Sequence, residues 1–209
     1  MELTSNSFSA GQPIPETFAF GRPDLDAHVT FAENRNPHLA WRDVPDNTRS
    51  FALICADPDV PSRPDDVNVE GREVPSDLRR IDFFHWVLAD LPPSARMIED
   101  GEFSAGVVPH GKDPGVGPQG SRAGINDYTD WFAGDPDMEG DYYGYDGPCP
   151  PWNDSIPHRY VFTLYALGVD RVPAESRFDG RDLRLVIADH VIAKADLTGT
   201  YTLNRRLLP

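Results

Sequence analysis

The stretch RYVFTLYAL, residues 159–167, is short, apolar after its first residue, and rich in aromatic and aliphatic side chains. Two further stretches share this character: SFALICA at residues 50–56 and FFHWVLA at residues 83–89. Pro, Asp or Gly bounds each of them, and such segments are typical of β-strands. Because their apolar residues run almost without interruption, we expect the three strands to be buried on both faces, as in the centre of a sandwich.

Weaker strand patterns occur at residues 18–19, 29–31 and 38–41. The chain contains 21 prolines and 17 glycines, which is turn chemistry suited to an all-β domain. Residues 101–157 are dense in Gly, Pro, Asp and Tyr and predict a long loop region, which in a compact domain usually serves a function. We therefore expect a mainly β fold, formed as a single domain over residues 1–209.

One helix is predicted near the C-terminus, over residues 181–195. Leu183, Val186, Ile187 and Val191 fall there at helical spacing. Asp179 or Gly180 provides a start signal.

The charge of the chain excludes several kinds of partner. Nineteen basic residues face 34 acidic ones, a formal net charge of -15, so nucleic acid and anionic membranes are repelled at long range. No apolar run approaches the roughly 20 residues of a transmembrane helix, and the N-terminus lacks the pattern of a secretory signal. These observations predict a cytoplasmic protein. Two explanations of the acidic, Lys-poor composition stay open: a halophile, or a GC-rich genome.

Three polar residues lie next to the predicted strands. Asp57 begins DPDVP directly after the first strand, and since proline cannot donate to a ladder, we expect the strand to stop there. His85 lies within the second strand, on one face with Phe83 and Val87 by alternation. His158 opens the third strand and shares a face with Tyr160.

Each of these features has an ordinary explanation on its own, such as a polar turn or a core histidine bonded to a carbonyl. Together, two histidines and an aspartate at strand ends suit a pocket for a phosphate or a carboxylate. The imidazole N–H groups would donate to the anion, and Asp57 would orient one ring and favour its charged form. Arg159 points to the opposite face, which predicts a structural ion pair instead of a ligand contact.

These residues resemble the signatures of the phosphatidylethanolamine-binding proteins, also called Raf kinase inhibitor proteins, and of their bacterial and archaeal branch in particular. The similar segments are DPDVPSR (residues 57–63), FHW (84–86) and GPCPPWNDSIPHRYVFTLYAL (147–167). The resemblance implies an antiparallel β-sandwich with a C-terminal helix beside a shallow anion pocket. The pocket carried over from the family comprises Asp57, Pro61, His85, Pro151, His158 and Tyr160.

The resemblance also implies a function. Members of the family bind phosphoryl groups and other small anions, phospholipid headgroups included, and several modulate kinases or proteases. They carry no metal and have no settled catalytic activity, so we expect no cofactor and a regulatory, non-catalytic role. The acidic segment at residues 127–146 is longer than in the animal members, and it predicts either a reshaped pocket mouth or a homodimer contact.

Three alternatives remain. A hydrolase would use His85 or His158 as general base, although only Ser62 and Cys149 are nearby nucleophiles. A metal site would use His85, His158, Asp57 and Asp59, although no ligand spacing supports it. An inhibitor of a kinase or protease would keep the pocket only as a vestige.

Overall fold

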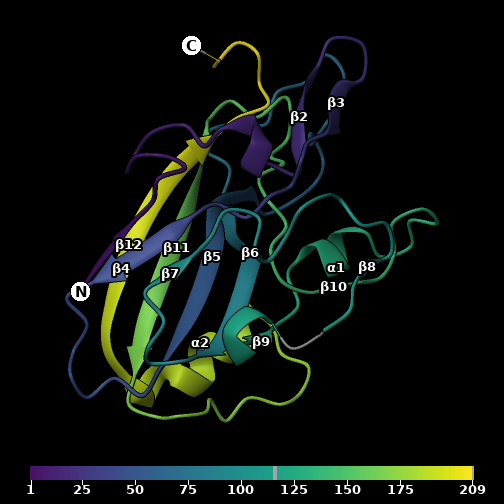
Figure 1. The fold of residues 1–209 in the computed structure, drawn as a ribbon. Helices are drawn as coiled ribbons and strands as arrows, with labels where there is room; N and C mark the ends of the chain where they lie inside the picture. The colour runs from purple at the N-terminus through teal and green to yellow at the C-terminus, as the bar shows by residue number, and fades with distance from the viewer. Residues whose placement is uncertain (115–116, 209) are drawn as a thin grey trace.

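The computed structural model describes residues 1–114 and 117–208. At its centre lies a five-stranded antiparallel sheet in the order β12-β11-β5-β6-β9. The strands are β12 (Val191–Tyr201), β11 (His158–Leu167), β5 (Ser50–Pro61), β6 (Arg80–Leu91) and β9 (Arg122–Ala123). The three strands predicted from the apolar stretches are therefore confirmed and lie side by side in the middle of this sheet (Figure 1).

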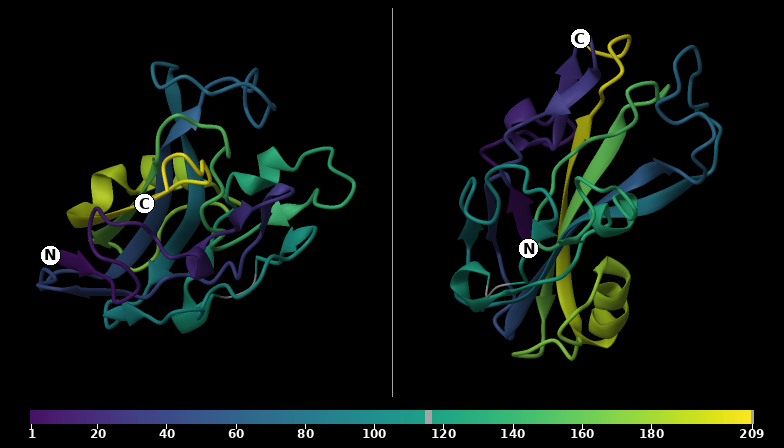
Figure 2. Two further views of the ribbon diagram at one scale, coloured as in Figure 1. Left: turned by 90° about the horizontal axis from the view of Figure 1, so that it is seen from above. Right: turned by 90° about the vertical axis from the view of Figure 1, so that its right-hand side faces the viewer.

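A smaller sheet covers one face of the central sheet. It consists of β1 (Glu2–Thr4), β4 (Leu39–Arg42) and β7 (Met97–Ile98), paired antiparallel. Trp41 and Ile98 of this sheet belong to one buried apolar cluster with Phe51, Trp86 and Phe162 of the central strands. The predicted β-sandwich is thus confirmed, and its two layers can be followed in the two views of Figure 2.

Helix α2 (Gly180–Ile187) covers the other face of the central sheet. Its Leu183 and Ile187 pack against Ile54, Phe84 and Val87 in a second buried cluster. Because both faces of the sheet are covered, its central strands have no solvent side, and this explains their almost uninterrupted apolar sequences.

The helix begins as predicted and ends earlier than predicted. Asp179 is the N-cap, and it forms a reciprocal capping box with Asp182. The prediction of a helix through residue 195 is wrong, because a 3-10 turn, η3 (Ala188–His190), ends it and β12 begins at Val191. From Val191 onward the chain pairs with β11, and this tertiary ladder, together with the β-branched residues there, overrides the helical spacing.

The remaining elements are short. The predicted strands near residues 29–31 and 38–41 are confirmed as β3 (His28–Phe31), which pairs with β2 (Gly21–Asp24), and as β4. The predicted strand at residues 18–19 is wrong: after Pro15 the chain forms a 3-10 turn, η1 (Glu16–Phe18). Residues 101–157 contain β8 (Gly111–Lys112), η2 (Pro118–Gly120), β9, α1 (Tyr128–Trp131) and β10 (Asp141–Tyr142). In the described part of the chain, every helix is too short or too polar to cross a bilayer.

Candidate functional site

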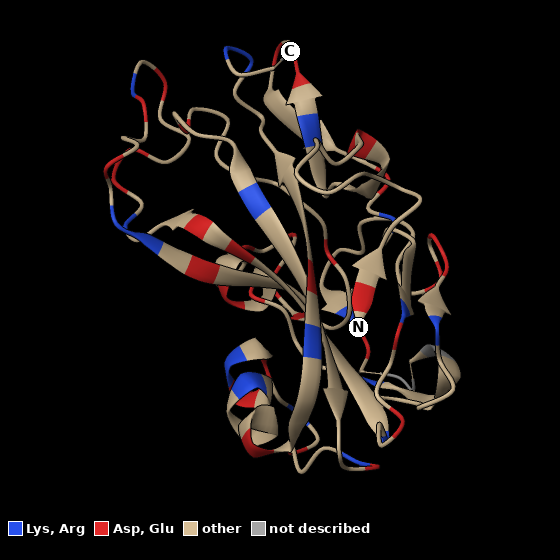
Figure 3. Ribbon diagram, turned by 90° about the vertical axis from the view of Figure 1, so that its left-hand side faces the viewer, with Lys and Arg blue, Asp and Glu red and all other residues tan. Residues whose placement is uncertain are grey.

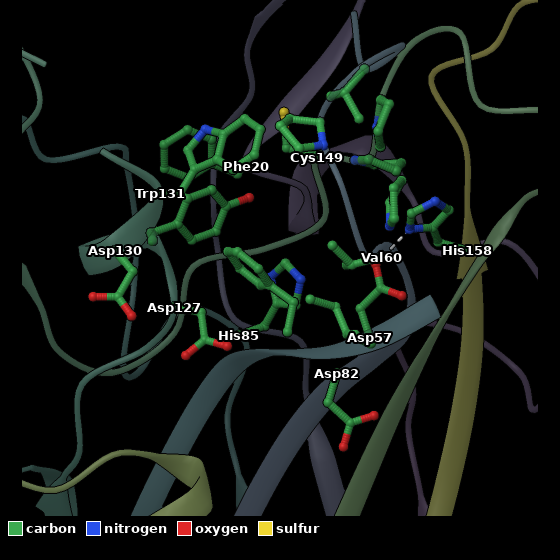
Figure 4. Close-up of a pocket in the computed structure, with 18 of the residues that line it drawn as sticks. Phe20, Asp57, Val60, Asp82, His85, Asp127, Asp130, Trp131, Cys149 and His158 are labelled. Carbon is green, nitrogen blue, oxygen red and sulfur yellow. Dashed lines mark hydrogen bonds and ion pairs between the residues drawn. The ribbon is translucent and has the colours of Figure 1, made fainter. Parts of the chain in front are cut away.

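A cavity of about 510 Å³ opens beside the ends of the central strands. Its lining includes all six residues of the predicted pocket: Asp57, Pro61, His85, Pro151, His158 and Tyr160. Figure 4 shows Asp57, His85 and His158 on neighbouring strands around this space. The structure therefore brings the predicted residues together, and their binding of a ligand stays a prediction.

Asp57 lies inside β5, which continues through the prolines to Pro61. The prediction that the strand stops at Asp57 is wrong. An irregularity between Asp57 and Val60 lets the ladder with β6 resume at Val60, so the prolines are accommodated without ending the strand. Asp57 is 1% exposed, and its Oδ1 accepts a hydrogen bond of 2.8 Å from the backbone N–H of Asp59.

His158 holds two carboxylates at once. Its Nδ1 donates to Asp57 Oδ2 at 2.7 Å, a contact drawn as a dashed line in Figure 4, and its Nε2 donates to Asp154 Oδ2 at 3.0 Å. Burial opposes a charge on this ring, but the hydrogen bonds and negative charges of Asp154 and Asp57 outweigh burial and raise the pKa of His158 to about 9. His158 is therefore an imidazolium at neutral pH.

This arrangement corrects one expectation about the site. Both N–H groups of His158 are committed to carboxylates, so the ring holds the floor of the cavity together and has no free donor for an anion. The related expectation, that Asp57 orients one ring and favours its charged form, is confirmed.

Arg80 and Asp154 complete the network beneath His158. Nη1 of Arg80 donates to Asp154 Oδ2 at 2.6 Å, and Nη2 donates to Asp154 Oδ1 at 3.0 Å. These hydrogen bonds and those from His158 overcome the cost of burial and lower the pKa of Asp154. The two cations and two anions, His158 and Arg80 with Asp57 and Asp154, balance one another. Arg80 and Asp154 were not among the predicted site residues, because Asp154 lies in a polar loop whose composition is that of an ordinary turn.

His85 faces the cavity and has one ring nitrogen without a hydrogen-bond partner among the described residues. Along the ladder Cys55 is opposite Trp86 and Ala56 is opposite Phe84, so His85 is the extra residue of a β-bulge. Bulges re-aim side chains, and this one breaks the predicted alternation: Phe83 and His85 line the cavity, but Val87 packs with Phe84 beneath α2.

The hydrogen bonds of His85 fix the identity of its free nitrogen. Its Nδ1 lies 2.8 Å from the backbone oxygen of Asp146, which can only accept, so Nδ1 carries a proton. Burial lowers the pKa of His85, although the charges of Asp57, Asp127 and Asp146 oppose the shift. The ring is therefore neutral at neutral pH, and no group of the described residues bonds its Nε2.

Tyr160 brings a hydroxyl group that has no partner. The residue is 1% exposed, lines the cavity, and its hydroxyl makes no hydrogen bond to any described residue. Its ring is edge-on to His85, with the ring centroids 5.1 Å apart. Buried hydroxyls almost always find a partner, so this one indicates a place for a ligand atom or a water molecule.

Most other carboxylates around the cavity are paired with arginines. Asp59 accepts from Nε and Nη2 of Arg159 at 2.8 and 2.7 Å, so the structural ion pair predicted for Arg159 is confirmed. Asp127 accepts from both Nη atoms of Arg181, and Asp82 pairs with Arg184. Acidic and basic residues are interspersed along the ribbon, α2 included (Figure 3). Because these carboxylates are paired with arginines, an anion in the cavity is repelled less than the net charge of the chain suggests.

The cavity mouth is apolar. Phe31, Ile81 and Trp131 are 56%, 43% and 54% exposed, and all three belong to the cavity lining. Trp131 lies on α1, inside the acidic segment at residues 127–146, so this segment contributes to the cavity mouth. A mouth reshaped relative to the animal members, or a homodimer contact, stays a prediction. Asp130 beside it carries a carboxylate with no ion pair among the described residues.

Neither a metal site nor a reactive thiol is apparent in the described residues. No group of three or more His, Cys, Asp or Glu side chains among them is arranged to hold a metal ion. Cys55 and Cys149 are both free thiols. Cys149 lines the cavity, and burial raises its pKa to about 12, so it is a poor nucleophile at neutral pH.

Comparisons with known proteins identify the family. The sequence model described as phosphatidylethanolamine-binding protein matches residues 4–202. The chain belongs to the phosphatidylethanolamine-binding protein family. Its similarity to the prokaryotic members confirms the branch expected from the sequence motifs.

The relatives within this family span bacteria and archaea. The chain is 29% identical over 202 residues to the UPF0098 protein YbhB of Escherichia coli K12, covering 97% of this chain and 100% of that protein. It is 32% identical over 203 residues to a UPF0098 protein of Methanothermobacter thermautotrophicus, covering 96% and 98%. The crystal structure of E. coli YbcL, described as a new member of the mammalian family, superposes with a TM-score of 0.67 at 25% identity, covering 96% and 97%.

Proposed function

We propose that this protein binds a small phosphorylated anion, such as a free phosphate or a phospholipid headgroup, in the cavity between His85 and Tyr160, and that it is regulatory and not catalytic. The observation that carries the proposal is the buried hydroxyl of Tyr160, which has no partner among the described residues. A phosphate oxygen is a strong acceptor for such a hydroxyl.

The surroundings support an anion of this kind. Most acids near the cavity are paired with His158 or with arginines, so their charge is largely offset where the ligand would lie. Asp130 at the mouth has no ion pair among the described residues. The apolar mouth formed by Phe31, Ile81 and Trp131 suits the organic part of a phosphate ester. Family membership, through the relatives that give the family its name, supports the same ligand class.

The hydrolase alternative is less consistent with the geometry. His158 already carries two protons at neutral pH and has no free nitrogen, so it lacks the lone pair of a general base. His85 has such a lone pair, but Cys149, which lines the same cavity, stays protonated. The proposal has three further parts: the protein regulates a partner such as a kinase or protease, it is cytoplasmic, and it forms a homodimer. Each of these needs its own experiment besides a binding test.

Isothermal titration calorimetry with phosphorylethanolamine and with inorganic phosphate tests the proposal. We expect saturable binding with one site per chain. Because a hydrogen bond to a charged group contributes about 1.5–3 kcal/mol, Tyr160→Phe should weaken the affinity roughly tenfold or more. His28→Gln is the matched control, since His28 stacks on Trp152 outside this cavity. No binding to the wild type, or equal binding to Tyr160→Phe, would count against the proposal.

A further inference from the structure

Asp146 determines which ring nitrogen of His85 faces the cavity. Its backbone oxygen accepts from Nδ1 of His85 at 2.8 Å, and its backbone N–H donates to the His85 carbonyl at 3.0 Å. The Asp146 side chain is itself held by Asn34 at 2.7 Å, Asn126 at 2.8 Å and Lys112 at 3.0 Å. Asp146 is fully buried, so this frame is rigid, and the ring presents Nε2 to the cavity in either charge state.

The charged and titratable groups around His85 come from four parts of the chain. Asp57 approaches from β5, Asp127 and Tyr128 from the start of α1, Asp146 from the loop before β11, and Tyr160 from β11. Each of the three acids is paired with its own cation: Asp57 with His158, Asp127 with Arg181, and Asp146 with Lys112. The three carboxylates therefore stabilise the protonated ring of His85 less, and burial among aromatic rings makes the neutral ring the favoured form.

A neutral ring held in this way has a lone pair on Nε2 and needs a hydrogen-bond donor. A fully deprotonated oxygen placed there would face the lone pair and be repelled by it. The nearby hydroxyl of Tyr160 has the opposite preference, because it is free to donate to an unprotonated oxygen. The site thus offers one acceptor and one donor to the same ligand group.

We propose that the cavity selects a phosphate group that still carries one proton, which donates to Nε2 of His85 while Tyr160 donates to another oxygen of the same phosphate. This inference rests on the proposed function and specifies its ligand. A phosphate monoester has its second pKa near 6, so its protonated monoanion is available around neutral pH. A sulfate ester has the same tetrahedral shape and the same single charge but no proton to donate.

The consequence is discrimination between two nearly identical anions. A site built to hydrogen-bond a ligand proton rejects an analogue that lacks it, because the site's own polar atom is left unpaired. For one buried imidazole nitrogen we expect phosphate to be favoured over sulfate roughly tenfold to a hundredfold. The ammonium group of ethanolamine is common to both esters, so it adds nothing to this ratio.

The test is calorimetric titration of the whole protein with phosphorylethanolamine and with the sulfate ester of ethanolamine, from pH 6 to pH 8.5. The inference predicts roughly fivefold or tighter binding of the phosphate ester at pH 6, where about half of it still carries the proton. Above about pH 6 the free phosphate loses its own proton, so the observed affinity should fall with each pH unit, and binding should take up one proton from the buffer.

Two variants sharpen the result. In His85→Gln the amide can rotate to accept or to donate, so the phosphate-to-sulfate ratio should fall toward one, whereas His28→Gln should keep the wild-type ratio. Equal affinity of the wild type for both esters, or an unchanged ratio in His85→Gln, overturns the inference and leaves the proposed function standing. If neither ester binds at any pH, the proposed function fails as well.

Discussion

His158 and Asp57 are 101 positions apart in the chain and are joined by a hydrogen bond of 2.7 Å from Nδ1 to Oδ2. They lie on adjacent strands, just beyond Ala56 and Val161, the last backbone pair of that ladder. The side-chain ion pair therefore holds β5 and β11 together beyond the point where their backbone pairing ends. At this point the two strands form the floor of the cavity.

The first prediction concerns pH and stability. The pKa of His158 is raised from 6.5 to about 9 in the folded protein, so its contribution is complete below pH 6.5 and is lost as pH rises through 9. The shift corresponds to about 3 kcal/mol. Urea unfolding of the wild type from pH 6 to pH 9.5 should show this fall, and NMR titration of the His158 ring should give a midpoint near pH 9. The half-buried His190→Gln variant should keep the same profile, and a His158 midpoint below pH 7 would refute the ion-pair assignment.

The second prediction compares a buried ion pair with an exposed one. Arg80→Gln leaves Asp154 buried without its guanidinium and should lower the free energy of unfolding by about 3–5 kcal/mol. Arg184→Gln removes the same group from the half-exposed pair with Asp82, and the loss should stay below about 1 kcal/mol. Chemical denaturation of both variants measures the difference. Equal losses would show that the Arg80–Asp154 pair is not a structural element of the site.

The third prediction tests the packing of α2 on the central sheet. A Cβ at Gly180 would lie 2.2 Å from a ring atom of Phe84, which is buried and cannot move away. Gly180→Ala should therefore cost about 1–3 kcal/mol of stability through overpacking. At Gly168 a Cβ would meet its nearest neighbour at an ordinary 3.7 Å, so Gly168→Ala should be tolerated. Thermal unfolding of the two variants distinguishes them, and a neutral Gly180→Ala would mean that α2 packs less closely than described.

The fourth prediction separates a ligand role for Tyr160 from a structural one. Its hydroxyl has no partner among the described residues, so Tyr160→Phe should leave the stability of the ligand-free protein unchanged within about 0.5 kcal/mol, or raise it. Tyr201 is the comparison, because its buried hydroxyl donates to the Gly21 carbonyl at 2.9 Å. Tyr201→Phe should lose about 1–3 kcal/mol. A large loss in Tyr160→Phe would show that the hydroxyl supports the fold itself.

Local patterns were enough to predict the central strands and the gathering of the pocket residues. The apolar runs at residues 50–56, 83–89 and 159–167 have the composition and length of buried strands, and adjacent strands bring their ends together. The end of α2 could not be predicted in the same way. Val191 continues the helical spacing, and only the pairing of residues after it with β11 assigns them to a strand.

The roles of the two histidines also depended on distant contacts. From the sequence both rings looked like equivalent donors to an anion. Asp154 and Asp57 use both nitrogens of His158, and the bulge at His85 together with the Asp146 carbonyl leaves His85 as an acceptor. No spacing in the sequence indicates that Asp146 would be held by Lys112 and face His85, because these residues come from three separate segments: β8, β6 and the loop before β11.

An NMR titration of the histidine and tyrosine side chains with phosphorylethanolamine at pH 6.5 tests most directly whether the ligand binds between His85 and Tyr160. We predict that the resonances of His85 and Tyr160 shift together along one saturation curve, while those of His28 and His110, outside the cavity, stay unchanged. Shifts at His28 or His110 with His85 and Tyr160 unmoved would contradict it.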